Sequence, residues 1–136
     1  MKILVLCTGN SCRSQMMEGF LKHYADGAHE IYSAGVEAHG LNPRAVAVMQ
    51  EAGLDISGQS SDLVTQYLNQ GIDSVITVCD HAAQLCPVFP EKTETHHHSF
   101  PDPAKATGSE EEIMAAFRST RDAIRTYAHD FLLKLA

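Results

Sequence analysis

Basic residues are scarce in this sequence, and their scarcity excludes one large class of proteins. Ten lysines and arginines face 17 aspartates and glutamates, which gives a formal net charge of −7. Nucleic-acid binding needs a concentrated Lys/Arg surface that neutralises phosphates. The composition therefore argues against a general nucleic-acid binder. A protein of this charge can still bind a small anion, but only through a local arrangement of hydrogen-bond donors.

Long hydrophobic runs are also missing. The apolar run in residues 1–7 is too short for a signal peptide or a membrane span, and no later stretch is longer. We therefore expect a cytoplasmic protein with no membrane association. Internal repeats, linkers and low-complexity segments are absent from the 136 residues, a length typical of one domain. We predict a single domain over residues 1–136.

No two of the four cysteines are spaced as Cys-x-x-Cys, the pattern typical of a zinc knuckle. In the cytosol thiols stay mostly reduced, so structural disulfides are not expected. Redox or nucleophilic chemistry is then the leading interpretation for Cys7, Cys12, Cys79 and Cys86.

Strand and helix patterns alternate along the chain. Apolar, β-branched runs predict buried strands at residues 2–6 and 74–78. A short strand is predicted at residues 31–35 and a weaker one at residues 93–97. Helices are predicted behind the first strand, between Asn42 and Gly53, from Ser60 through Leu68, and after a capping box formed by Ser109 and Glu112. This alternation indicates an α/β fold, with a four-stranded parallel sheet flanked by helices on both faces.

Cys7 and Cys79 both follow predicted strands directly. Ligands of such sheets bind outside the carboxyl ends of the strands. We therefore expect the two cysteines to share one site.

The segment between the first strand and the first helix is typical of an oxyanion site. Five residues separate Cys7 from Arg13, so a short loop can turn several backbone N–H groups toward one anion, at the positive end of a helix. Arg13 adds a planar fork that can bind two oxygens. The same N–H groups would stabilise a thiolate, which predicts a lowered pKa for Cys7. The predicted oxyanion-binding residues are Thr8, Gly9, Asn10, Ser11, Cys12, Arg13 and Ser14.

These residues closely resemble the low-molecular-weight protein tyrosine phosphatase superfamily, whose loop reads Cys-x5-Arg-Ser between a strand and a helix. The longer string in residues 7–16 is similar to the thioredoxin-coupled arsenate reductase branch. Further similar segments are residues 32–35, 39–43, 55–57, 61–63 and 78–80, and the pair Cys86-Pro87. The resemblance implies a phosphatase-like fold over essentially the whole chain.

The resemblance also implies a mechanism. Cys7 would attack arsenate held by Arg13, with Asp102 as proton donor and Ser14 hydrogen-bonded to the Cys7 thiolate. Cys79 would then attack Cys7 and release arsenite, and Cys86 would attack Cys79 before thioredoxin reduces the final disulfide. Residues 80–88 would have to move. Phosphate or sulfate would compete with arsenate, no cofactor would be obligatory, and a monomer is expected.

Two groups of polar residues allow a metal interpretation. Asn10, Glu18, Ser33 and Asp62 match positions that bind potassium in some members of this branch, although a polar network bracing the loop would use the same residues. His96, His97 and His98 are consecutive, so in a strand only the outer two could converge on a metal. We expect the histidines to form the edge of the fourth strand.

Two alternative functions are a low-molecular-weight tyrosine phosphatase and a non-catalytic oxyanion or redox sensor. Asp102-Pro103 is followed by Ala104-Lys105-Ala106, which offers no aromatic surface for a phosphotyrosine ring. A sensor would not need an acid at Asp102. Cys12 has no chemical role in the implied mechanism, and we expect it to pack within the loop.

Overall fold

The structure is a computed structural model that describes residues 1–90 and 92–135. Its sheet has four strands in the order β2-β1-β3-β4, and every neighbouring pair is parallel. The strands are β1 (Lys2–Cys7), β2 (Glu30–Gly35), β3 (Ser74–Thr77) and β4 (Glu94–His97). All four predicted strands are found, with ends that differ by one residue. The predicted α/β fold with a four-stranded parallel sheet is confirmed.

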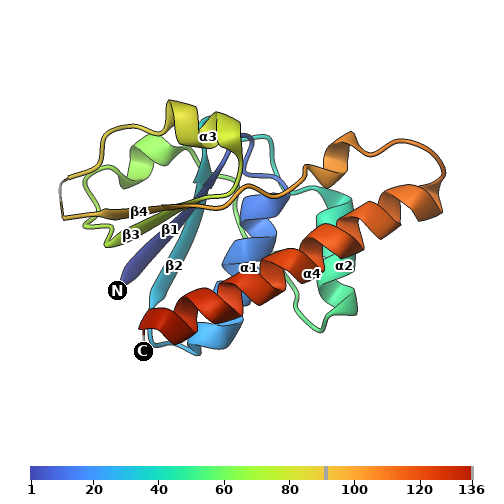
Figure 1. The fold of residues 1–136 in the computed structure, drawn as a ribbon, viewed down its shortest axis with the longest axis horizontal. Coiled ribbons are helices and arrows are strands. Elements are labelled where there is room, and N and C mark those ends of the chain that lie inside the picture. The colour runs from blue at the N-terminus through green and yellow to red at the C-terminus, as the bar shows by residue number, and fades with distance from the viewer. Residues whose placement is uncertain (91, 136) are drawn as a thin grey trace.

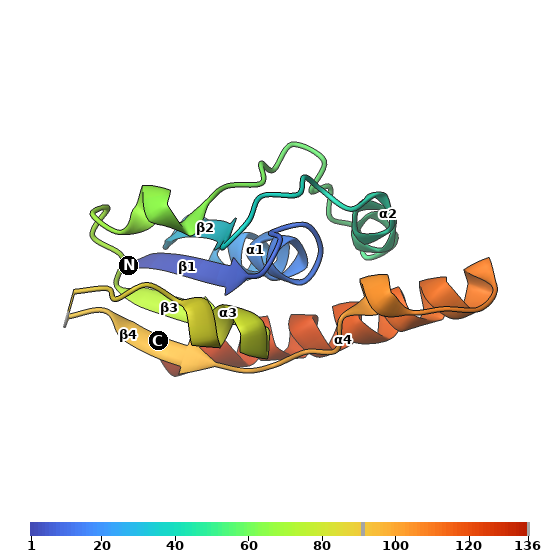
Figure 2. The ribbon, with the colours of Figure 1, turned by 90° about the horizontal axis from the view of Figure 1, so that it is seen from above.

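The described residues also form four α-helices and two short 3₁₀ helices. They are α1 (Arg13–Ala25), α2 (Pro43–Glu51), η1 (Val64–Tyr67), α3 (Asp80–Leu85), η2 (Pro103–Lys105) and α4 (Glu110–Leu135). The long α4 crosses α1 and α2 (Figure 1), and α3 lies beyond the carboxyl end of β3, near that of β1 (Figure 2). Within residues 1–90 and 92–135, no helix combines the length and the apolar character that crossing a lipid bilayer requires.

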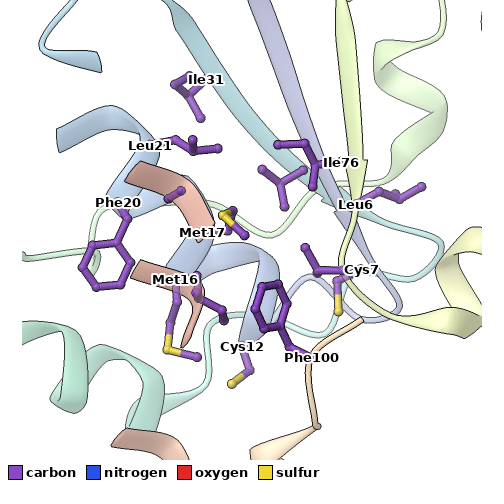
Figure 3. Packing of buried hydrophobic residues seen from close by; sticks show 14 of the residues in the cluster. Leu6, Cys7, Cys12, Met16, Met17, Phe20, Leu21, Ile31, Ile76 and Phe100 are labelled. Carbon is purple, nitrogen blue, oxygen red and sulfur yellow. The ribbon is translucent and has the colours of Figure 1, made fainter. Parts of the chain in front are cut away.

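The core lies between the sheet and α1. Ile3, Leu4, Val5 and Leu6 of β1 are fully buried, so both faces of this central strand are covered. A parallel strand buried on both faces has a continuous apolar run, which is why β1 was recognisable in the sequence. Figure 3 shows the side chains that α1 contributes beside those of the strands, namely Met16, Met17, Phe20 and Leu21.

Side-chain caps fix two of the helix starts, as the sequence predicts. The Asn42 side chain accepts hydrogen bonds from the backbone N–H groups of Arg44 (2.8 Å) and Ala45 (3.4 Å), and Pro43 is the first helical residue. A cap of this kind stabilises a helix by about 1 kcal/mol. At the start of α4, Ser109 Oγ accepts from Glu112 N at 3.1 Å.

The buried face of α2 consists of Ala45, Val48 and Met49, and Val46 and Ala52 are partly buried against the core. The contacts of α2 with both α1 and α4 decide which face is covered.

The predicted helix from Ser60 through Leu68 is wrong, because only η1 is helical there. Asp62 accepts a hydrogen bond from Gly35 N, its own N–H donates to Asn10 Oδ1 at 2.8 Å, and Leu63 forms a bridge with Gly35. Backbone groups used in these bonds to the neighbouring loop and strand are not available to begin a helix.

Candidate active site

Residues 8–12 connect β1 to α1 in a loop whose carbonyl groups face outward. The carbonyls of Thr8, Gly9 and Ser11 accept hydrogen bonds from Glu37 N, His39 N and Asn42 N at 2.8–2.9 Å. In the part of the chain that the structure describes, the N–H groups of residues 9–12 donate to no protein acceptor. Unused amides of this kind, at the N-terminus of α1, are the donors that an oxyanion requires.

Asn10 holds the loop in shape from within. Its backbone adopts the left-handed conformation (φ +49°) that asparagine tolerates better than most residues. Its fully buried side chain donates to Ser14 Oγ (2.8 Å) and Ser33 Oγ (2.9 Å) and accepts from Asp62 N. The loop is therefore tied to α1, to β2 and to the segment before η1.

Two side chains and one glycine complete this bracing. The carbonyl of Asn10 accepts from Gln15 Nε2 (2.9 Å) and from Ser61 Oγ (3.0 Å). Gly35 ends β2 so close to the loop that an added Cβ would lie 2.7 Å from the Thr8 carbonyl oxygen and 2.9 Å from Asn10 N. Only glycine fits there without displacing the loop backbone.

Arg13 begins α1 and is oriented before any anion binds. Its Nη1 donates to the carbonyl of Phe100 at 3.0 Å, and its Nη2 lies 3.6 Å from Asp102 Oδ2. Its Nε is buried without a hydrogen-bond partner among the described residues. A buried donor left unpaired costs free energy, so a bound oxyanion that accepted from Nε would relieve that cost.

Asp102 lies at the start of η2, where its Oδ1 accepts from Ala104 N at 3.0 Å. Its side chain is 24% exposed and meets Arg13 at the rim of the loop. An acid in this position can deliver a proton to an oxygen of an anion held by Arg13.

Cys7 and Cys79 meet as the sequence predicted. The two sulfurs lie 3.9 Å apart, although 72 residues separate them in the chain, and each cysteine is only 4% exposed. Cys79 also contacts Thr8 Oγ1 at 3.2 Å and accepts from Ala82 N, in the first turn of α3, at 3.4 Å. All four cysteines are free thiols.

The pKa values of these two thiols shift in opposite directions, and the shift of Cys7 is upward, contrary to the lowered pKa that the sequence suggested. Its hydrogen bond to Cys79 and its burial raise the pKa of Cys7 well above the usual range, although Arg13 and the Thr8 amide act in the opposite sense. Hydrogen bonds from Cys7, Thr8 and Ala82 lower the pKa of Cys79 to about 5. These hydrogen bonds therefore favour the thiolate form of Cys79.

The hydrogen-bond partner of Ser14 also differs from the one expected, which was the Cys7 thiolate. The Ser14 hydroxyl accepts from Asn10 Nδ2, and no hydrogen bond joins it to Cys7 within the described residues. Cys12 is buried in the loop, and burial raises the pKa of its thiol to about 12, consistent with a packing residue.

Cys86 does not reach the other sulfurs. Cys79 precedes α3 and Cys86 follows it, and Cys86 Sγ donates a hydrogen bond to the carbonyl of Pro87, at 3.5 Å. Seven residues along a helix span about 10 Å, at a rise of about 1.5 Å per residue. A disulfide requires Cα atoms within about 7 Å. A bond between Cys79 and Cys86 would therefore require α3 to unwind.

A cavity of about 450 Å³ opens over the loop. It is lined by Thr8, Arg13, Cys79, Asp80, His81, Ser99, Asp102 and Lys105. The cavity brings together the predicted anion clamp, the predicted acid and the second cysteine, while Cys86 lies outside it.

The family model for low molecular weight phosphotyrosine protein phosphatase matches residues 2–136. This chain belongs to that family. An arsenate reductase of Halalkalibacterium halodurans is 55% identical over 122 residues, which are 90% of this chain and 88% of that protein. An arsenate reductase of Bacillus subtilis is 49% identical over 129 residues, 95% of this chain and 93% of that protein.

Solved structures have the same fold. An arsenate reductase in an oxidized state matches with a TM-score of 0.86 at 30% identity, covering 99% of this chain and 98% of that one. An arginine phosphatase matches with a TM-score of 0.82 at 24% identity, covering 99% of this chain and 95% of that one, a likeness of fold alone. The resemblance to the phosphatase family and its arsenate reductase branch is confirmed.

The four residues considered for potassium lie together in this member of the family. Asn10 contacts Ser33, the Ser33 hydroxyl donates to Glu18 Oε1, and Asp62 reaches Asn10 through its backbone. The other carboxylate oxygen of Glu18 pairs with Lys22 Nζ. The ammonium of Lys22 thus supplies positive charge at this carboxylate, so the donor set fits a potassium ion only in part.

The three consecutive histidines have different partners. His96 packs edge-on against Phe131, while His98 lies against Phe100 and Tyr127. His97 bonds Thr77 Oγ1 through Nδ1 (2.7 Å) and Asp80 Oδ1 through Nε2 (2.9 Å). Within the described residues, no three His, Cys, Asp or Glu side chains are grouped to hold a metal ion.

Three features of the site escaped the sequence analysis. The Thr8 hydroxyl contacts Cys79, His81 Nδ1 lies 3.2 Å from Thr8 Oγ1, and Lys105 lines the cavity. His81 carried one usable signal, because it comes two residues after a cysteine at a strand end.

Proposed function

We propose that this protein reduces arsenate to arsenite, using Cys7, Cys79 and Cys86 in that order, with thioredoxin as the reductant of the final disulfide. The observation that carries the proposal is the second sulfur at the anion loop, 3.9 Å from the first. Ester hydrolysis needs one nucleophilic cysteine, whereas reduction of arsenate needs two electrons, which two thiols supply on forming a disulfide. Relatives at 55% and 49% identity that are arsenate reductases support the same substrate.

The first step joins Cys7 to arsenic. The loop amides and Arg13 hold the oxyanion, the proton of Cys7 passes to Cys79, and the Cys7 sulfur attacks arsenic. Asp102 gives a proton to the departing oxygen, which leaves as water. Arsenic stays pentavalent in this step.

The second step transfers the electrons. The Cys79 thiolate attacks the Cys7 sulfur, an S–S bond forms, and the S–As bond breaks with its electron pair going to arsenic. Arsenic becomes trivalent and leaves as arsenite, while the two sulfurs are oxidised. Cys86 then attacks Cys79, the thiol of Cys7 is regenerated, and a dithiol partner reduces Cys79–Cys86.

The cavity favours this function over the tyrosine phosphatase. No phenylalanine, tyrosine or tryptophan is among the described residues that line it, so an aryl phosphate finds no stacking surface. Phosphate and sulfate would compete with arsenate because the loop recognises a tetrahedral oxyanion. A potassium ion at Asn10, Glu18, Ser33 and Asp62, a monomeric state and a cytoplasmic location stay predictions.

Two serine variants test the order of the cysteines in single-turnover mixtures. Cys86→Ser should release one arsenite per protein and stop as a Cys7–Cys79 disulfide. Cys79→Ser should keep arsenic on Cys7 and release almost none. Peptide mapping by mass spectrometry identifies the joined sulfurs. Repeated turnover of both variants with thioredoxin would refute the relay.

A coupled assay tests the reductant. Arsenate-dependent oxidation of NADPH should be fast with thioredoxin and its reductase and slow with glutaredoxin and glutathione. The reverse preference would refute thioredoxin as the partner.

A further inference from the structure

The proposed reaction needs a way for a proton to leave Cys79. The thiol of Cys7 donates a hydrogen bond to Cys79, so the attack of Cys7 on arsenic leaves that proton on Cys79. Cys79 must then lose it before attacking Cys7, because the thiolate is the nucleophile. Cys79 is only 4% exposed, which limits direct exchange with water. This inference rests on the proposed function.

One chain of contacts leads from Cys79 to solvent. Thr8 Oγ1 lies 3.2 Å from Cys79 Sγ and 3.2 Å from His81 Nδ1. A hydroxyl can accept one proton while it donates another, so it can pass a proton without a net change. His81 is an exposed residue of α3, and it lines the cavity over the anion loop.

We propose that His81 takes up the proton of Cys79 through the Thr8 hydroxyl and acts as a positioning residue for the second step. The S–H bond of Cys79 breaks, the Thr8 oxygen receives that proton, and the original hydroxyl proton forms an N–H bond on His81. This step is a proton transfer, and no atom is oxidised or reduced. The imidazolium then directs the Thr8 hydroxyl toward the Cys79 thiolate and releases its proton to water.

Other charged groups face this relay, and they remain in place when His81 is changed. Arg13, Asp102 and Lys105 line the same cavity. Asp80 precedes His81 on α3 and pairs with His97 Nε2 at 2.9 Å. These charges act on Cys79 with or without the relay, so the test must separate the Thr8 path from the general electrostatics of the cavity.

The first experiment needs no arsenate. Alkylation of Cys79 by iodoacetamide is followed against pH, with peptide mapping to separate the four thiols. His81→Ala and Thr8→Val should each raise the midpoint pH of Cys79 alkylation by about one unit. Below that midpoint, the fraction of Cys79 in the thiolate form is then about tenfold lower at a given pH. Thr8→Ser keeps the hydroxyl and should match the wild type, as should Gln84→Ala, a control on the same helix.

The double variant identifies the path. If His81 acts through Thr8, His81→Ala combined with Thr8→Val should shift the profile no further than Thr8→Val alone. Additive shifts would show that His81 acts independently of Thr8 and would overturn the proposal. An unchanged profile in His81→Ala would also overturn it. His81→Asn, which cannot take up a proton, should behave like His81→Ala while its side chain preserves the packing.

The second experiment uses single turnovers with arsenate in the Cys86→Ser background. His81→Ala should form the Cys7 adduct at the wild-type rate but release arsenite about 10²-fold more slowly, a loss typical of a missing proton acceptor. Added imidazole should restore release, which a merely structural role would not allow. Equal release rates with and without His81 would refute the relay. Failure of the parent variant to release arsenite would instead refute the proposed function, and the alkylation profile would still test the relay.

Discussion

The anion loop and the segment that follows β3 lie at the same edge of the sheet, but they are held in very different ways. Asn10 and Ser14 are fully buried and hydrogen-bonded to three separate parts of the chain. Beyond Cys79, by contrast, Leu85 is 52% and Val88 96% exposed. A loop that recognises an anion gains from rigid donors, whereas a segment that carries electrons outward must be able to leave its place.

The contrast continues in the two ends of α3. Cys79 at its start is buried and makes contacts with Cys7, Thr8 and Ala82. Cys86 at its end is half-buried, packs against the core, and donates a hydrogen bond to its neighbour Pro87. The rigid region therefore includes Cys79, whereas Cys86 belongs to the exposed segment. The proposed transfer of the disulfide from Cys79 to Cys86 connects these two regions.

Loss of the nucleophile should have the largest effect. Cys7→Ser should abolish arsenate reduction, because a serine hydroxyl is a poor nucleophile in this loop. Cys12→Ser is the matched control in the same loop and should keep its activity, since burial raises the pKa of Cys12 to about 12. Arsenite release measures both. Substantial reduction by Cys7→Ser would remove Cys7 from its role.

Loss of the acid should come next. Asp102→Asn should lower turnover by about 10²–10⁴-fold, the usual contribution of a general acid, while arsenate affinity is spared. The amide can still accept from Ala104 N, so η2 should begin as before. Steady-state kinetics separates kcat from KM. A loss confined to KM would make Asp102 an anion-binding residue instead.

Asn10→Ala probes the rigid region directly. The change removes two buried hydrogen bonds and one partly buried one, and leaves Asp62 N without its acceptor, at a cost of about 1–3 kcal/mol. Asn69→Ala, at an exposed asparagine, is the matched control and should leave the free energy of unfolding unchanged. Denaturant unfolding compares the two. Equal stability in both variants would mean that the loop does not depend on Asn10.

Exchange of potassium for sodium tests whether Glu18 takes part in a potassium site. In the wild type, Lys22 pairs with Glu18, so the two salts should give nearly equal melting temperatures. Lys22→Met should make melting depend on potassium, with an effect of about 1 kcal/mol or less because Lys22 is half exposed. Strong potassium dependence in the wild type would show that the ion binds in spite of Lys22.

The smallest effect on stability is expected in the exposed segment that follows Cys79. Val88→Ser should change the free energy of unfolding by no more than about 0.5 kcal/mol, as is usual for an exposed site. Val75→Ser, on the fully buried β3, should cost much more. Chemical denaturation measures both. A large loss of stability in Val88→Ser would show that this segment is packed against the rest of the protein.

Much of the fold was predictable because its signals are local. The buried strands are continuous apolar runs, and Asn42 and Ser109 mark helix starts through contacts with residues two or three positions away. The helix expected from Ser60 failed for the opposite reason. Its backbone is engaged with Asn10 and Gly35, residues that are distant in sequence and that no local pattern reveals.

The sequence by itself determined the anion loop, since the spacing of Cys7 and Arg13 between a strand and a helix sets its shape. It also determined that Cys79 would lie at the same sheet edge, because parallel strands end together. Only the tertiary structure decided how the surroundings act on the two thiols, lowering the pKa of Cys79 and raising that of Cys7. That balance depends on burial and on hydrogen bonds between residues up to 72 positions apart, which a linear sequence does not show.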